Sequence, residues 1–295
     1  MNTSSLSLFI VAAPPIVGSF IVLALAAVGW GVWITHLLAI FLACCLGLAG
    51  SHVSKLGNRQ NVAFAVVMLT LTGLAISLLG DSTGPERWIP IGPLRLYVAP
   101  LLLPSFIAAC SVFLEKDGKY QVIPFAAVLV ASLLLALQPD ASQVLGLLVA
   151  AAVVIVRYQL GLLCFGAIVF PLALLALWAF LLPDRLAPVP HVEEVFALAF
   201  GHSLFAGIAI ITSAIALIVG LLVQSVSGSL WLSAVAAYYI VLFLCSTTGI
   251  TPAPLVGYGA GPILGYGLVV GLLGWFKHQS GPYKSMQPTA NAATD

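Results

Sequence analysis

The sequence predicts an all-α polytopic membrane protein with about ten transmembrane helices. Of its 295 residues, 62% are hydrophobic and only 6% are charged, whereas a soluble domain usually has about 25% charged residues. Apolar runs long enough to cross the hydrocarbon core recur along the chain. The runs are continuous rather than alternating, which favours helices, because a helix satisfies its backbone hydrogen bonds within one segment. A soluble enzyme is excluded.

Ten apolar runs are separated by polar breaks, and each run is expected to form one spanning helix. They cover residues 8–29, 33–50, 61–80, 96–114, 120–137, 141–156, 159–182, 194–224, 229–249 and 259–276. Residues 1–277 are expected to form a single transmembrane domain. Residues 278–295 are polar and contain proline, so they are expected to form a disordered cytoplasmic tail.

The distribution of cations predicts that both termini are cytoplasmic. Lys and Arg near span ends are retained on the cytoplasmic side, and an even number of spans places both termini on one side. With the N-terminus inside, seven of the ten cations are cytoplasmic and three are outside. The inner seven are Lys55, Arg59, Lys116, Lys119, Arg157, Lys277 and Lys284, and the outer three are Arg87, Arg95 and Arg185.

Several function classes are disfavoured by the same composition. A net charge of +1 leaves no basic surface for nucleic acid, and the five cysteines lack the spacing of a zinc site or a disulfide framework. His202, in the eighth run, is the ionisable residue expected well inside a span, as a bundle histidine, which argues against an ion-coupled pump. Gly267 and Gly271 form a GxxxG pattern that predicts close helix packing.

Four loops on the predicted outer face contain most of the residues that hydrophobicity does not explain. They cover residues 80–100, 137–143, 181–202 and 247–267. Taken singly, each loop favours a structural role, because Gly, Pro and Asp are ordinary turn residues and an Arg-Trp pair is common at a membrane interface. The specific order of their motifs favours a functional site instead.

The motifs resemble those of the SEDS family of cell-wall proteins (FtsW, RodA and SpoVE), of which this chain looks like a short, divergent member. The matching residues are Gly84, Arg87, Trp88, Ile89, Ile91, Gly92 and Pro93; Gln138, Pro139 and Asp140; His191, Glu193, Phe196, Ala197 and Gly207; and Thr248, Gly249, Ile250, Pro252, Pro254, Val256, Tyr258 and Gly259. The predicted span number and orientation agree with that family.

The resemblance implies a role in peptidoglycan synthesis during cell division or elongation, in the bacterial cytoplasmic membrane. Family members polymerise glycan strands from lipid II, a polyprenyl-diphosphate-linked glycan, and this chemistry needs a carboxylate base and positive charge near the diphosphate. Asp184 and Glu193 are the candidate catalytic residues. Candidate substrate-binding residues are Arg87, Trp88, Asp140, Gln138, His191 and Tyr258. A divalent cation is a candidate cofactor without an identified ligand set.

The chain also departs from the family pattern. The long outer loop that carries the family's catalytic aspartate shrinks to residues 183–193, and the Glu and Lys usual at the start of span four are Pro100 and Leu103. Three functions therefore stay open. The first is a lipid II glycosyltransferase; the second is a non-catalytic scaffold or regulator that binds lipid II or a penicillin-binding transpeptidase; the third is a flippase of lipid-linked precursors.

Overall fold

The computed structural model describes residues 3–53, 58–79, 87–91, 94–114, 122–183, 188–226 and 229–279. Its elements, in chain order, are α1 (Thr3–Leu25), α2 (Trp30–Val53), α3 (Arg59–Ser77), β1 (Trp88–Ile91), β2 (Leu94–Tyr97), α4 (Val98–Leu114), α5 (Val122–Leu137), α6 (Ala141–Arg157), α7 (Leu162–Leu181), α8 (Val195–His202), α9 (Leu204–Val226), α10 (Trp231–Ser246) and α11 (Ala260–Gln279). Ten long helices among the described residues confirm the predicted polytopic helical fold.

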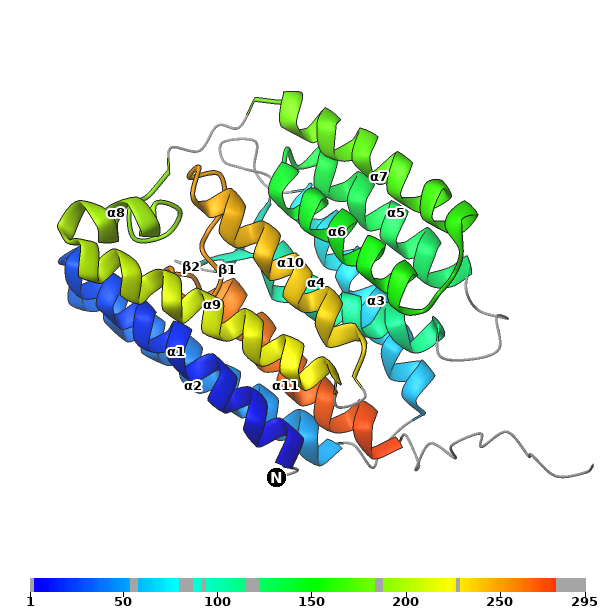
Figure 1. Cartoon of the computed structure of the whole chain (residues 1–295), viewed down its shortest axis with the longest axis horizontal. Helices are drawn as coiled ribbons and strands as arrows, with labels where there is room; N and C mark the ends of the chain where they lie inside the picture. The colour runs from blue at the N-terminus through cyan, green and yellow to red at the C-terminus, as the bar shows by residue number, and fades with distance from the viewer. Residues whose placement is uncertain are drawn as a thin grey trace, which may run out of the picture.

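The helices divide into a central pair and two flanking groups (Figure 1). Helices α4 and α10 lie in the middle, with α1, α2, α9 and α11 on one side and α3, α5, α6 and α7 on the other. All α4 residues except Leu101 are buried. The hydrophobic core therefore surrounds α4, and its apolar residues pack against protein on nearly every face.

Helix length varies with position in the bundle. Helices α1, α2, α3, α7 and α9 are long and apolar enough to cross a membrane by length and composition, and less than half of each apolar stretch is buried. Helices α4 and α10 have 17 and 16 residues, or about 25 Å at 1.5 Å per residue. Because neighbouring helices surround them, these short helices need not match the hydrocarbon thickness of about 30 Å.

A β-hairpin precedes α4, in a region that the sequence predicted to be a loop followed by a span from residue 96. Strands β1 and β2 are antiparallel, with Trp88 opposite Tyr97 and Ile91 opposite Leu94. The Trp88 and Tyr97 rings stack with centroids 5.0 Å apart. The alternating Trp-Ile-Pro-Ile and Leu-Arg-Leu-Tyr segments suit such a pair of strands, so α4 begins only at Val98.

The eighth predicted span is wrong as a single helix, because the chain breaks at Ser203. The Ser203 backbone is extended, with φ −164° and ψ 155°, and its Oγ accepts a hydrogen bond from the Ala206 amide, as a helix N-cap does. The short helix α8 ends before this break and α9 begins after it. His202 consequently lies exposed at the end of α8 and is not a bundle histidine.

The described histidine that is buried within a spanning helix is His36 of α2, which the sequence reasoning missed. Its Nε2 lies 2.7 Å from the Ser19 Oγ of α1. Ser19 in turn donates to the Ile16 carbonyl oxygen. A neutral imidazole can donate through Nε2 to this hydroxyl, so a histidine is accommodated there without a carboxylate partner.

The backbones of helices α2 and α11 pack in direct contact, as the GxxxG pattern predicted. A Cβ atom added at Gly267 would lie 2.5 Å from the Ala43 carbonyl oxygen. A Cβ atom added at Gly50 would lie 2.5 Å from the Gly271 Cα. Both distances are too short for a real side chain, so glycine is required for this packing.

Gly267→Ala is expected to lower the thermal unfolding midpoint of the detergent-solubilised protein. The new methyl group meets backbone rather than a flexible side chain, so α2 and α11 must separate, at a cost of about 1–3 kcal/mol. Gly166→Ala is the matched control, because no heavy atom lies within 4 Å of its added Cβ. Equal midpoints for the two variants would contradict the close approach.

Candidate functional site

Four connections meet at one end of the bundle, which we call the hairpin end. They are the hairpin β1–β2, the α5–α6 turn at residues 138–140, the segment 188–194 and the α10–α11 loop at residues 247–259. The first and last described residues lie at the opposite end of the bundle (Figure 1). Candidate residues that are distant in the sequence are therefore brought together at the hairpin end.

Asp140 is the buried centre of this region. One of its oxygens, Oδ2, accepts a 2.5 Å hydrogen bond from the Tyr97 hydroxyl, and Oδ1 accepts one of 3.1 Å from the Ser142 hydroxyl. The Arg87 Nη1 lies 3.9 Å from Oδ1. Asp140 occupies the N-cap position of α6 but makes no side-chain cap hydrogen bond. Its carboxyl group therefore links the hairpin to the α5–α6 turn.

Burial governs the ionisation of this group. Asp140 is 1% exposed and Arg87 is 4% exposed. Burial raises the pKa of Asp140, while the Arg87 charge and the hydrogen bonds from Tyr97 and Ser142 oppose that rise. Burial also raises the pKa of Tyr97, so the phenol stays protonated and acts as a donor. Asp140 is thus enclosed by protein and suited to hold other groups in place.

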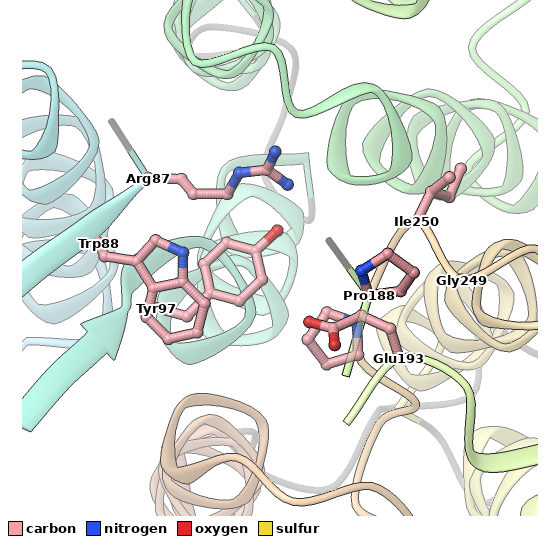
Figure 2. Close-up of a pocket in the computed structure, with 8 residues that line it drawn as sticks. Arg87, Trp88, Tyr97, Pro188, Glu193, Gly249 and Ile250 are labelled. Atoms are coloured by element: carbon pink, nitrogen blue, oxygen red, sulfur yellow. The ribbon is translucent and has the colours of Figure 1, made fainter. Parts of the chain in front are cut away.

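A small cavity lies beside this group (Figure 2). Arg87 and the stacked Trp88 and Tyr97 rings form one side, and Pro188 and Glu193 form the opposite side. Its remaining wall comes from Gly249, Ile250 and Pro252 of the α10–α11 loop. The volume is about 20 Å³, enough for about one water molecule. A cation and a carboxylate therefore line the same cavity.

The segment 188–194 lines one side of this cavity and is hydrogen-bonded to the α10–α11 loop. The Ala253 amide donates to the Val192 carbonyl oxygen at 3.1 Å, and the Tyr258 amide donates to the His191 carbonyl oxygen at 2.8 Å. Within the segment, the Glu193 Oε2 accepts a hydrogen bond from the Val189 amide at 2.8 Å. Glu193 therefore stabilises the segment as well as lining the cavity.

Gly249 allows the α10–α11 loop to turn into the cavity wall. Its φ of +74° is in the left-handed region that favours glycine. A Cβ atom at this position would also lie 3.4 Å from the Pro188 Cβ. That distance is an ordinary van der Waals contact, so glycine at this position of the Thr-Gly-Ile motif serves the turn.

A larger groove of about 510 Å³ adjoins the cavity. Trp88, Tyr97 and Pro252 line both spaces. The groove is mainly apolar and runs between α2, the hairpin and the start of α11, where its lining includes Leu38, Ala39, Leu42, Leu96, Val192 and Leu264. Arg95, an exposed cation, also lines it. The apolar groove thus lies next to the polar cavity, with Trp88, Tyr97 and Pro252 in the walls of both.

Tyr258 fixes one wall of the groove. Its hydroxyl lies 2.7 Å from the Thr35 Oγ1 of α2. Its ring centroid lies 6.1 Å from that of His36 and 5.8 Å from that of His191. Burial lowers the pKa of His191. Tyr258 and His191 thus lie beside the groove, while their contacts are with protein.

The remaining predicted site residues lie apart from the cavity or outside the described chain. Gln138 Nε2 donates to the Leu74 carbonyl oxygen at 2.8 Å and to the Ser77 Oγ at 2.9 Å, so this side chain joins α5 to α3. Asp184 lies outside the described residues. Within the described ranges, no group of three or more His, Cys, Asp or Glu side chains is placed to hold a metal ion.

Sequence reasoning missed Tyr97 and Pro188, which both line the cavity. The Tyr97 hydroxyl donates to Asp140, a contact that no sequence motif indicated. The alternation of Leu94, Arg95, Leu96 and Tyr97 could have indicated a strand with Arg95 and Tyr97 on one face. Pro188 had no comparable signal, because its position depends on how segment 188–194 folds back.

Asp140→Asn is expected to gain stability relative to the wild type as the pH rises. Because burial raises the folded-state pKa of Asp140 above the ordinary value of about 3.9, its contribution to the free energy of unfolding is present below the unfolded-state pKa. That contribution is lost as the pH rises through the folded-state pKa. Thermal unfolding midpoints between about pH 4 and about pH 8 test this.

Ser77→Ala is the control for this experiment. It removes a buried hydroxyl at the same end of the bundle that accepts a hydrogen bond from Gln138, but it removes no titrating group. Its midpoint should therefore differ from the wild type by a constant amount across the pH range. If the wild type instead gains stability relative to Asp140→Asn as the pH rises, the Arg87 charge lowers the pKa of Asp140 by more than desolvation raises it.

The fold resembles that of known structures. Rod shape determining protein RodA of Thermus thermophilus is 21% identical, with a TM-score of 0.68 over 92% of this chain and 95% of that chain. A mutant of the same RodA is 21% identical, with a TM-score of 0.66 over 92% and 96%.

A chain from a peptidoglycan synthase complex, in a structure concerned with the coordination of polymerization and crosslinking, is also 21% identical. Its TM-score is 0.65 over 93% of this chain and 98% of that chain. No protein-family model and no curated protein matches the sequence. The described chain has the polytopic helical fold of the RodA structures.

Proposed function

We propose that the protein acts in bacterial cell-wall biogenesis, where it binds a polyprenyl-diphosphate-linked glycan such as lipid II. The hairpin end would face the outside of the cytoplasmic membrane. The RodA-like fold supports this proposal, as do the family-like motifs around Arg87, Asp140 and Gly249. The observation that carries it is that the Arg87 cavity and the apolar groove lie next to each other, with Trp88 and Tyr97 in the walls of both.

This layout suits an amphiphile with an anionic head. The aliphatic lining at Leu38 and Leu42 provides an apolar surface for a polyprenyl chain. Arg87, with its planar fork of donors, would bind diphosphate oxygens. The Trp88 Nε1 is buried and has no hydrogen-bond partner among the described residues, so it supplies a further donor to an anion. The apolar chain would thus lie in the groove, and the charged head would lie beside it at Arg87.

The small size of the cavity argues against turnover in this conformation. A volume of about 20 Å³ holds about one water molecule and no sugar ring. Segment 188–194 would have to move for a glycan to reach Arg87. The non-catalytic scaffold is therefore the function that we place first. A penicillin-binding transpeptidase is the partner we propose, and the likeness to a chain of a peptidoglycan synthase complex supports it.

A lipid II glycosyltransferase is the second candidate, because Glu193 lies across the cavity from Arg87. Glu193 would act as the base opposite the cation that stabilises the leaving diphosphate, once a shift of segment 188–194 admits the substrate between them. Such a pair meets the requirement for a base and for charge stabilisation. Asp184, the other candidate base, lies outside the described residues.

Arg87→Lys is expected to weaken lipid II binding to the purified protein in nanodiscs by about tenfold. Lysine keeps the positive charge beside Asp140 but loses the bidentate fork, and about 1.4 kcal/mol of lost interaction corresponds to tenfold in affinity. Titration with fluorescent lipid II measures the effect. Arg157→Lys is the control, because Arg157 lies exposed at the opposite end of α6 from Asp140.

The groove provides the second arm of this experiment. Leu42→Trp, which fills the groove, should weaken binding of lipid II but leave a water-soluble diphosphate headgroup unaffected. Leu37→Trp, on an exposed position of the same helix, should leave both unchanged. Unaltered lipid II affinity in both Arg87→Lys and Leu42→Trp would exclude the proposed binding mode.

For the glycosyltransferase function, Glu193→Gln is expected to abolish glycan-strand synthesis from lipid II, because the amide cannot accept the hydroxyl proton. Gel analysis of the glycan product measures it, and Glu194→Gln, one residue on, should keep the activity. If wild-type protein makes no product under conditions in which a longer SEDS protein polymerises lipid II, the scaffold function stands and the second candidate is excluded.

A further inference from the structure

Tyr97 is the buried residue on which the Arg87 cavity and the groove converge. It is the last residue of β2, is 2% exposed and lines both spaces. Its ring stacks on Trp88, and its hydroxyl donates to Asp140. The start of α11 packs closely on its backbone, because a Cβ atom added at Gly261 would lie 2.6 Å from the Tyr97 carbonyl oxygen. The side chain is therefore fixed at both ends.

The Tyr97 hydroxyl lies between two charged groups. It donates to the Asp140 Oδ2 at 2.5 Å and also interacts with the Arg87 guanidinium. The second carboxylate oxygen accepts a hydrogen bond from Ser142. The distance from Arg87 Nη1 to Asp140 Oδ1 is 3.9 Å, longer than the roughly 2.7–2.9 Å of a hydrogen-bonded ion pair. Both carboxylate oxygens are thus occupied by hydroxyl donors.

Arg87 consequently lies at the cavity wall. It lines the cavity of about 20 Å³ on one side and a second cavity of about 70 Å³, beside the start of α6 and the end of α7, on the other. A guanidinium that closed onto Asp140 would move toward the carboxylate by about 1 Å, from the observed separation to that of a direct ion pair. This movement would change the position of the guanidinium at the cavity wall.

We propose that Tyr97 is a positioning residue for anion binding: by holding the Asp140 carboxylate, its hydroxyl keeps the Arg87 guanidinium at the cavity wall. The identity of the anion, a lipid-linked diphosphate, rests on the proposed function. The positioning itself rests on the contacts of Tyr97, Asp140 and Arg87. In the absence of the hydroxyl, a buried carboxylate oxygen without its donor takes the nearest cationic donor, which is Arg87.

The other titratable groups near Asp140 do not replace this donor. Tyr238 and Cys245 of α10 interact electrostatically with Asp140. The Tyr238 hydroxyl, however, donates to the Gln143 Oε1, and a thiol is a weak donor. Among the described residues, Tyr97 and Ser142 donate hydroxyl hydrogen bonds to the carboxylate, and of these two only Tyr97 also lines the cavity of about 20 Å³.

Tyr97→Phe in the full-length protein tests the proposal, because phenylalanine keeps the ring and its stacking on Trp88. Tyr266→Phe is the matched control: Tyr266 is also buried, and its hydroxyl donates to the Leu8 carbonyl oxygen at 2.8 Å, away from Asp140. Both variants lose one buried hydrogen bond, so their thermal midpoints should fall similarly. A purely structural role for Tyr97 predicts that the two variants behave alike in every further measurement.

Infrared difference spectroscopy without ligand is the first measurement. The Asp140 carboxyl band is the one that Asp140→Asn removes, and it should shift in Tyr97→Phe but not in Tyr266→Phe. Titration with fluorescent lipid II in nanodiscs is the second. Tyr97→Phe should bind about tenfold more weakly, and the loss should be much smaller when it is introduced into Arg87→Lys, because both substitutions act through the same cation.

The two measurements separate the positioning from the proposed function. An unshifted Asp140 band in Tyr97→Phe overturns the positioning role, as does an equal loss of affinity in Tyr97→Phe and Tyr266→Phe. If the wild type binds no lipid II, the proposed function fails, and the infrared band still decides whether Tyr97 holds Asp140.

Discussion

The contact among Tyr97, Asp140 and Arg87 is the interaction on which the hairpin end depends. It joins the residue before β1, the end of β2 and the turn between α5 and α6, three segments that hydrophobic packing alone would not hold in one register. Burying a carboxylate and a guanidinium together costs desolvation free energy, and the loss of one partner would leave the other charged and enclosed. The local geometry is therefore specified by polar contacts within an otherwise apolar molecule.

Most of the helical architecture could be predicted from the sequence, because a segment that crosses lipid must be a continuous apolar run that satisfies its backbone hydrogen bonds as a helix. The boundaries of α4, α5 and α6 lie within two residues of the predicted runs. The break at Ser203 escaped prediction because the surrounding residues are as apolar as a continuous span. What ends α8 there is an extended backbone and a serine cap, which are local features that hydropathy does not measure.

The sequence indicated which segments form the candidate site, but not which side chains in it contact one another. Arg87, Trp88 and Glu193 were all identified from motifs, and they line one cavity. Gln138 was also identified from a motif, yet its side-chain amide donates a hydrogen bond to α3. A motif does not specify whether a residue faces the cavity or the bundle. Tyr97 was missed as a partner of Asp140 because the two residues are 43 positions apart.

The packing of α2 on α11 has a consequence for the groove at the hairpin end. The two helices meet at glycine and alanine near residues 43–50 and 267–271, and the same helices line the groove with residues 35–42 and 259–264. Because the two helices contact each other directly beside the groove, the angle at which they cross influences the width of the groove. A methyl group added at Gly267, about one helical turn from the groove residue Leu264, would therefore change the width of the groove.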